Sequence, residues 1–186
     1  MVWLAAVAIG LIGGVVGGGK IENLVHLRFR WPWFVVAALI VRVSVVLTPL
    51  NRVDGIQYVY AATLAALVAW TVWQIDRTPG IWLVTAGAAL NLLVIAANAG
   101  RMPVAPEIGG SLVQRGQIGQ YTLMSQGTHL NWLADWIALP GPFQRVLREA
   151  YSPGDLIVAL GIAVVVLLAM RTRPDETSRR IVSDPP

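Results

Sequence analysis

Two aspartates near the end of the sequence have the residue type and the setting for acid–base chemistry. Asp135 lies in the segment HLNWLADWI, and Asp155 lies in SPGD at the start of the last apolar run. When two carboxyl groups share one water molecule, the pKa of one is raised, so that one group acts as the acid and the other as the base. If the two side chains lie a few ångströms apart, Asp135 and Asp155 would be the catalytic residues of a hydrolase.

Asp155 also has a structural role that needs no chemistry. The run Ser152-Pro153-Gly154-Asp155 has the pattern of a helix start. Serine is the expected N-cap, proline suits the first helical position, and aspartate at the third completes a capping box. The sequence favours this role, which would also hold the carboxylate rigidly at the mouth of a helix bundle.

The segment from His129 to Ile137 is amphipathic at helical spacing. Its tryptophans share one face, and Asp135 lies on the opposite side. We expect a short helix that lies flat on the outer surface of a membrane, with the tryptophans toward the bundle or the lipid. Asp135 would then point outward and pair with Arg145 or Arg148, away from Asp155.

A second group of polar residues falls inside apolar segments. Arg42 interrupts the run VVAALIVRVSVVL, and we place it near the middle of the bilayer, where a charge is costly and suggests function. Asn91 lies at a matching depth, with Asn98 two turns further along and Arg101 beyond it. These residues predict either a polar binding pocket between two helices or a structural contact of Arg42 with Asn91 and Ser44.

His129 offers a further possibility, because it lies close to Trp132 in an aromatic setting. A histidine in such a setting could bind a haem or another pigment, and His129 and Trp132 are therefore candidate binding residues. The sequence has no cysteine and predicts no metal site, so the cofactor, if there is one, is not identified.

Composition fixes the fold class. The chain of 186 residues is 56% hydrophobic and 13% charged, whereas soluble domains have about 25% charged residues. Crossing the hydrocarbon takes about 20 residues. We therefore predict an all-α membrane protein, a bundle of five transmembrane helices in residues 1–170. The helices are expected near residues 2–18, 33–50, 56–74, 81–100 and 155–170.

Charges and tryptophans predict the orientation. Trp31, Trp33, Trp70, Trp73 and Trp82 fall at helix ends that share one side of an up-and-down bundle, as in an aromatic belt. Basic residues on that side are Lys20, Arg28, Arg30, Arg77, Arg171, Arg173, Arg179 and Arg180; those on the other are Arg52, Arg101, Arg115, Arg145 and Arg148. By the positive-inside rule, the N-terminus is outside, the loop 101–154 with its short amphipathic helices is extracytoplasmic, and the tail 171–186 is cytoplasmic.

The first apolar run suggests a partner. Gly10, Gly14 and Gly18 recur at every fourth residue, a spacing that lets two membrane helices approach closely. We expect a membrane protein partner on this glycine face or on the outer loop, besides the lipid bilayer itself. The basic residues form no solvent-facing stripe, so we expect no nucleic acid partner.

The C-terminal half resembles the end of lipoprotein (type II) signal peptidases. The likeness lies in LADWIALPG followed by AYSPGDLIVALGIAVVVLL. That family is an intramembrane aspartyl protease with two aspartates at the outer surface, and Asp155 takes the place of the second. The first belongs to a Gly-Asn-x-x-Asp-Arg motif, where this chain has AANAGRMPV: Asn98 and Arg101 match, and the aspartate is missing. The family's early Asp-x-x-Thr-Lys pattern is also absent.

The chain also resembles an uncharacterised bacterial multi-pass family known only as a domain of unknown function. The likeness lies in NAGRMPV, in the Asp-Trp-Ile-x-Leu-Pro step and in the SPGD helix start. This resemblance implies a multi-pass fold in the bacterial plasma membrane and no assigned activity.

From the sequence we favour a non-catalytic integral membrane protein, either a subunit of a larger complex or a small-molecule binder. The alternatives are an intramembrane aspartyl hydrolase that uses Asp135 and Asp155, and a pigment- or haem-binding subunit that uses His129. The direction in which Asp135 points separates the first two.

Overall fold

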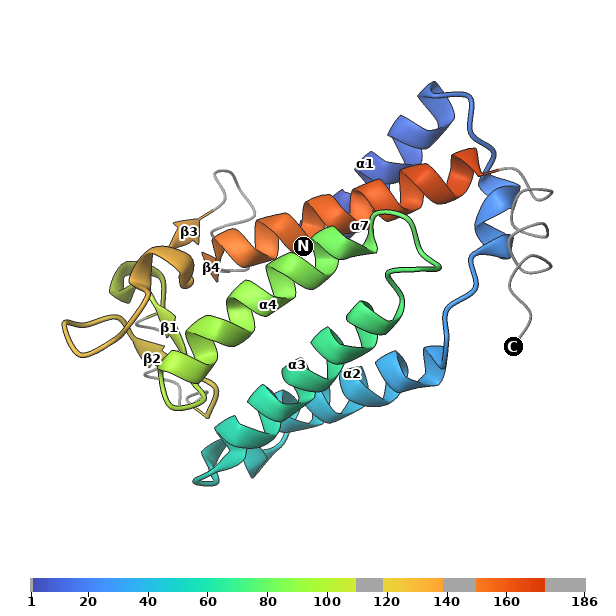
Figure 1. Ribbon diagram of the computed structural model, residues 1–186. Helices are drawn as coiled ribbons and strands as arrows, with labels where there is room; N and C mark the ends of the chain where they lie inside the picture. The colour runs from blue at the N-terminus through green and yellow to red at the C-terminus, as the bar shows by residue number, and fades with distance from the viewer. Residues whose placement is uncertain (1, 110–118, 139–149, 173–186) are drawn as a thin grey trace.

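The structure is a computed structural model that describes residues 2–109, 119–138 and 150–172. The chain is mostly helical within these ranges (Figure 1). Its long helices are α1 (Val2–Val16), α2 (Pro32–Leu47), α3 (Ile56–Trp73), α4 (Ile81–Ala97) and α7 (Pro153–Arg171). The shorter elements are η1 (Ile21–His26), η2 (Pro49–Arg52), β1 (Met102–Val104), β2 (Tyr121–Leu123), η3 (Asn131–Leu133), β3 (Ile137–Ala138) and β4 (Ala150–Tyr151).

Each of the five predicted apolar segments is a helix, with ends that local chemistry explains. The second was expected to reach residue 50, but α2 ends at Leu47 because Pro49 has no backbone N–H to continue the ladder and starts η2 instead. Gly55 and Gly80 precede α3 and α4 with φ of 92° and 86°, backbone conformations that glycine adopts at little cost.

By length and composition, α3 and α7 are long and apolar enough to cross a membrane. The other apolar helices, α1, α2 and α4, have between 10 and 17 residues by the same measure. Apolar side chains on these helices nevertheless face outward, and Leu4, Ile40 and Leu47 are 70%, 61% and 78% exposed.

The expectation of an all-α chain was wrong in the region between α4 and α7. There β1 pairs with β2 in parallel, and β3 pairs with β4 antiparallel. Residue 135 also forms a parallel bridge to Val104, so β1 has a neighbour on both sides. All three residues of β1 are buried, and buried backbone groups need hydrogen-bond partners. Because β1 is extended, those partners come from β2 and from residue 135, which are distant in sequence.

Helix α7 packs against both α1 and α4 (Figure 1). A Cβ atom added at Gly10 of α1 would lie 2.7 Å from the Ala163 carbonyl oxygen, and one added at Gly14 would meet the Met170 side chain. The predicted close approach of helices is therefore present, and at Gly10 and Gly14 the neighbour is α7 of the same chain. A partner protein on that part of the face has no room, whereas Gly18 has open space around it.

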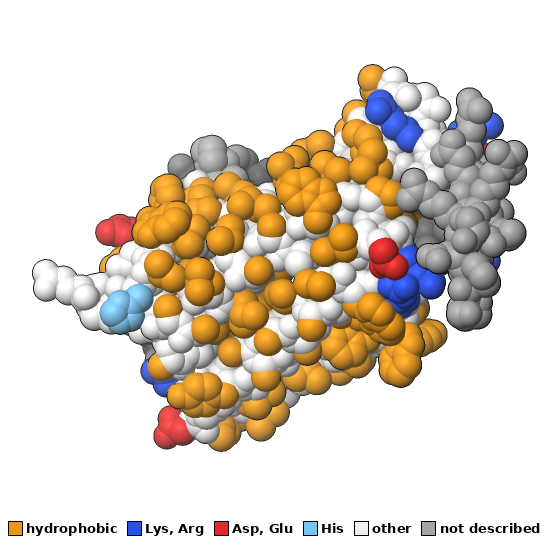
Figure 2. Space-filling view, in the orientation of Figure 1, with side chains coloured by type: hydrophobic (Ala, Val, Ile, Leu, Met, Phe, Trp, Pro, Cys, Tyr) orange, Lys and Arg blue, Asp and Glu red, His pale blue; other side chains and the backbone are white. Residues whose placement is uncertain are grey.

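The bundle has two ends, visible as the right and left sides of Figure 1. The Arg30 end comprises the start of α2, the end of α3, the start of α4 and the end of α7. The Asp155 end comprises the end of α2, the start of α3, the end of α4, the four strands and the start of α7. On the face drawn in Figure 2, hydrophobic side chains cover the middle of the bundle and charged side chains gather toward the two ends.

Candidate functional site

Asp155 lies in the first turn of α7, where it forms the capping box with Ser152 that was predicted from the sequence. The Asp155 backbone N–H donates to Ser152 Oγ at 2.9 Å, and the Ser152 N–H donates to Asp155 Oδ2 at 3.1 Å. Asn91 on α4 adds two bonds: its Nδ2 donates to Asp155 Oδ1 at 2.8 Å, and its Oδ1 accepts from Ser152 Oγ at 2.8 Å. Both oxygens of the Asp155 carboxyl group thus accept hydrogen bonds, which suits an ionised carboxylate.

Two glycines bring the capping box this close to α4. A Cβ atom added at Gly87 of α4 would lie 2.5 Å from the Gly154 carbonyl oxygen and 2.7 Å from the Val158 nitrogen. A Cβ atom at Gly154 would meet the Asn91 side chain. Since these positions have no room for a side chain, the glycines set the contact between Asn91 and Asp155.

Asp135 is buried beside β1. Its backbone N–H donates to the Pro103 oxygen at 3.0 Å, and its own carbonyl accepts from Ala105 N at 2.9 Å. The residue is 6% exposed, and its Oδ1 atom has no hydrogen-bond partner in the part of the chain that the structure describes. Burial, with a smaller contribution from the negative charge of Asp155, raises the pKa of Asp135 to about 8. Asp135 is therefore mostly protonated at neutral pH.

The prediction of an outward Asp135 on a flat amphipathic helix was wrong. Only Asn131–Leu133 is helical, as the single turn η3, and the chain then becomes extended to pair with β1. Successive side chains of an extended chain point to opposite faces. Asp135 is therefore buried, whereas its neighbour Trp136 is 49% exposed. The arginines expected to pair with Asp135, Arg145 and Arg148, lie outside the described residues.

Arg42 reaches the same end from α2, and among the described residues no hydrogen bond joins it to Asn91 or Asn98, the neighbours expected from the sequence. Its guanidinium carbon lies 3.7 Å from the centroid of the Tyr60 ring on α3, and its charge acts on Asp155. Asn91 is instead bonded to the capping box, and Asn98 is bonded elsewhere. The reason is packing, because α2 lies against α3. The NH1 atom of Arg42 is buried and has no hydrogen-bond partner among the described residues.

Two tyrosines belong to the site and were not predicted. Tyr60 lies under Arg42, and Tyr121 lies in β2, where burial and then the charges of Tyr60, Asp135 and Asp155 raise the pKa of its phenol group. Tyr60 could have been noticed as a polar tip within an apolar run, but the sequence gives no sign that β2 pairs with β1 and packs against the end of α4. Hydrogen bonds, ring contact or charge interactions connect a set that we call the acid cluster: Arg42, Tyr60, Asn91, Tyr121, Asp135, Ser152 and Asp155.

The other candidate residues have different settings. Asn98 holds the segment at His129 onto α4. Its Nδ2 donates to the Val94 and His129 oxygens at 2.8 and 2.9 Å, and its Oδ1 accepts from His129 N at 2.8 Å. The His129 side chain is exposed, as is Trp132 at 69%. Arg101 has a buried Nε atom without a partner among the described residues. In the described ranges, no group of three or more His, Cys, Asp or Glu residues is placed to hold a metal ion.

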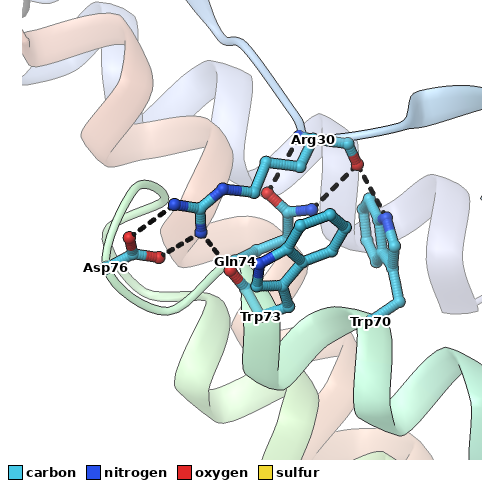
Figure 3. A network of polar contacts seen from close by, with 5 residues as sticks. All are labelled: Arg30, Trp70, Trp73, Gln74 and Asp76. Atoms are coloured by element: carbon cyan, nitrogen blue, oxygen red, sulfur yellow. Dashed lines mark hydrogen bonds and ion pairs between the residues drawn. The ribbon is translucent and has the colours of Figure 1, made fainter. Parts of the chain in front are cut away.

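The Arg30 end holds a polar network of another kind (Figure 3). The Arg30 guanidinium donates two hydrogen bonds to the Asp76 carboxylate, at 2.8 and 3.0 Å, and one to the Trp73 carbonyl at 2.6 Å. The Arg30 backbone exchanges bonds with the Gln74 side chain and accepts one from the Trp70 indole. This network fastens the segment before α2 to the end of α3, so it has a structural explanation.

Comparison with known proteins identifies a family. No curated protein and no solved structure is significantly similar to the chain. Residues 26–167, which include every residue of the acid cluster, match DUF5317, described as a family of unknown function. Since the match extends over most of the sequence, the chain belongs to the DUF5317 family.

Proposed function

We propose that the chain is a multi-pass protein of the bacterial plasma membrane in which all five apolar helices cross the bilayer. The support is the outward-facing apolar surface of the helices between two polar ends (Figure 2). Tryptophans at the Arg30 end agree with a membrane interface. The excess of basic residues on that side makes it cytoplasmic, so the Asp155 end is extracytoplasmic.

Single cysteines test this topology cleanly, because the chain has none of its own. Ser125 is exposed at the Asp155 end, and Arg77 is exposed at the Arg30 end. In intact cells, a membrane-impermeant thiol reagent should label Ser125→Cys and should reach Arg77→Cys only after the membrane is opened. The reverse pattern would overturn the orientation, and labelling of both in intact cells would overturn the spanning arrangement.

For the activity, we propose an intramembrane aspartyl hydrolase that acts at the outer surface, the alternative that the sequence alone ranked second. The observation that supports it is the contrast between two carboxyl groups at the same end of the bundle, where the charge of Asp155 acts on Asp135. Asp155 accepts hydrogen bonds at both oxygens, whereas Asp135 is buried with a pKa raised to about 8. At neutral pH one is therefore suited to be the base and the other the acid.

The chemistry follows from these protonation states. The Asp155 carboxylate accepts a proton from a water molecule as the water oxygen bonds to an amide carbonyl carbon, and the protonated Asp135 donates its proton to the carbonyl oxygen. Collapse of the tetrahedral intermediate breaks the C–N bond, with a proton passing to the leaving nitrogen. The products are a carboxylic acid and an amine. A peptide bond next to a membrane anchor fits the location, and the partial likeness to lipoprotein signal peptidases points to the same substrate class.

The experiment compares N-termini of outer-surface membrane proteins from cells that make the wild type, Asp135→Asn or Asp155→Asn. Acid and base groups of this kind contribute about 10²–10⁴-fold to a rate, so N-termini produced by the wild type should be missing from both variants. Asp76→Asn, at the opposite end, is the matched control and should retain them. If both variants give the wild-type set at equal protein level, the hydrolase is excluded.

A non-catalytic binder or complex subunit is the second candidate, and the exposed tryptophans favour it. Trp132 and Trp136 present broad aromatic surfaces on the outer loop, and the Trp136 indole bonds to the Trp132 carbonyl at 3.0 Å. Aromatic residues of this kind are enriched at protein interfaces. Purification of the tagged protein from gently solubilised membranes should then retain a stoichiometric partner that Trp132→Ser releases, whereas a hydrolase alone predicts no such partner.

A further inference from the structure

The guanidinium group of Arg42 has an unusual setting. Arginine is always charged and carries five N–H donors. Arg42 stacks 3.7 Å from the Tyr60 ring centroid, which holds the plane of the group but leaves the buried NH1 atom without a hydrogen-bond partner among the described residues. A buried charged donor without an acceptor is costly, so an acceptor from outside the described chain would stabilise it.

The neighbouring carboxyl groups do not provide the missing acceptor. The oxygens of Asp155 accept hydrogen bonds from Asn91 and Ser152. Asp135 has an unpartnered oxygen of its own, and no hydrogen bond or ion pair joins it to Arg42 within the described residues. A donor and an acceptor in one cluster therefore both lack partners. By charge, the ligand that suits the arginine is an anion.

The place of Arg42 along α2 indicates the source of that anion. The residue lies five positions before Leu47, the end of the helix, which is about 8 Å along the axis at 1.5 Å per residue. Counted from Trp33 at the other end of the apolar run, the same residue lies about 14 Å deep, which is why it was expected near the middle of the bilayer. Leu39, Ile40 and Val43 nearby are at least half exposed, as expected for a lipid-facing surface. Arg42 is then within reach of the headgroup layer.

We propose that Arg42 binds the phosphate group of a phospholipid at the Asp155 end, with Tyr60 fixing the orientation of its guanidinium group. A guanidinium matches a phosphate with two parallel hydrogen bonds. The inference rests on the proposed function only in placing this end at the membrane surface. It adds a bound lipid beside the acid cluster, either as part of the substrate or as a fixed wall of the site.

The test uses the full-length protein in mild detergent and measures binding of a short-chain phosphatidylglycerol by calorimetry. The wild type should bind it, and Arg42→Gln should weaken binding by about 10-fold or more, the usual effect of losing a hydrogen bond to a charged group. Arg77→Gln removes the same charge from an exposed position at the other end and is the matched control. Arg42→Lys keeps the positive charge but loses the planar guanidinium group with its two parallel N–H donors, so it should bind with intermediate affinity.

Further ligands and variants define the outcomes. A short-chain diacylglycerol without phosphate should not compete, a measurement that needs only the wild type and holds if Arg42→Gln fails to fold. Inorganic phosphate that binds equally well in an Arg42-dependent way would support the anion site and identify a soluble source. Equal binding by wild type and Arg42→Gln, or none by either, overturns the proposal. Asp135→Asn, inactive as a hydrolase, should still bind lipid, so the two proposals can fail separately.

Discussion

Charged residues at the two ends of the bundle differ in their exposure to water and in their hydrogen-bond partners. At the Arg30 end, the Arg30–Asp76 pair is bidentate, Asp76 is largely exposed, and a buried glutamine satisfies the backbone beside it. At the Asp155 end, Asp135 is buried and Arg42 is half-buried, and each has a buried atom without a hydrogen-bond partner among the described residues. Stability alone explains the first arrangement. The second is costly, and residues kept in costly settings cluster at functional sites.

The contrast also separates charged residues that look alike in the sequence. Arg30 and Arg42 are both arginines near tryptophan- or tyrosine-bearing helices, and each lies over an aromatic ring. Only Arg30 has a carboxylate partner among the described residues. An ion pair at the surface contributes little and is weakened by salt, whereas a change to a buried polar group has larger effects on stability.

The largest expected effect is the pH dependence that Asp135 gives to stability. Its pKa is about 8 in the folded protein and about 3.9 when unfolded. Between these values the folded state binds more protons than the unfolded state, so stability should fall as pH rises, by up to about 1.4 kcal/mol per pH unit. Thermal unfolding of Asp135→Asn in detergent between pH 5 and 8 should show a flatter profile than the wild type. Equal slopes would mean that Asp135 is not buried as described.

The next effect tests whether glycines hold the Asp155 end together. In Gly87→Ala, the new Cβ atom would meet backbone atoms of Gly154 and Val158, which cannot move without shifting α7. Overpacking of this kind costs about 1–3 kcal/mol, and we expect the upper part of that range. Gly13→Ala is the matched control, because its Cβ atom would meet only the flexible tip of Leu167 at 3.1 Å. Unfolding temperatures that fall equally in both would contradict the assigned α4–α7 contact.

A third, smaller effect is expected from the buried amide at the Arg30 end. Gln74 is fully buried and bonds to both the N–H and the carbonyl of Arg30, at 3.0 and 2.9 Å. Gln74→Leu leaves the Arg30 N–H unpaired, while the Arg30 carbonyl keeps its bond from the Trp70 indole, and the change should cost about 1–3 kcal/mol in stability. Because the network is structural, the variant should keep any hydrolysis and lipid binding per folded molecule. Loss of either activity at normal stability would show that this end also has a functional role.

The sequence was sufficient to predict features that depend on residues close together along the chain, such as helices and their caps. Ser152 and Asp155 are three residues apart, and their capping box forms as expected. The five apolar helices and the shared end of Trp31 and Trp73 are also correct. Periodicity and caps act within a few residues, so they can be recognised without knowledge of the tertiary fold.

What could not be predicted depends on pairing between distant segments. Helical spacing placed Asp135 on an outward face, but its segment pairs with β1, about 30 residues earlier. Likewise, depth along two helices suggested Asn91 as the neighbour of Arg42, whereas the order of packing gives Tyr60. Periodicity describes the faces of one element and does not say which element lies against them. The candidate residues were therefore found, and their contacts were not.

The smallest expected effect is that of Asp76, and its sign is opposite to that of Asp135. The hydrogen bond from Arg30, aided by the charge of that arginine, lowers the pKa of Asp76. A lowered pKa means that the pair stabilises the folded state above the unfolded pKa of about 3.9 and that this contribution is lost as pH falls through the folded value. Asp76→Asn should lower the unfolding temperature slightly at pH 7 in dilute buffer, and this difference should shrink progressively as the pH falls below about 3.9. Because the side chain is exposed, about 1 M salt should screen the attraction and remove most of the difference. The effect of Asp135→Asn should persist in the same salt, since its main cause is burial. If salt instead cancels the Asp135 effect and spares that of Asp76, the assignment of a structural end and a functional end would have to be reversed.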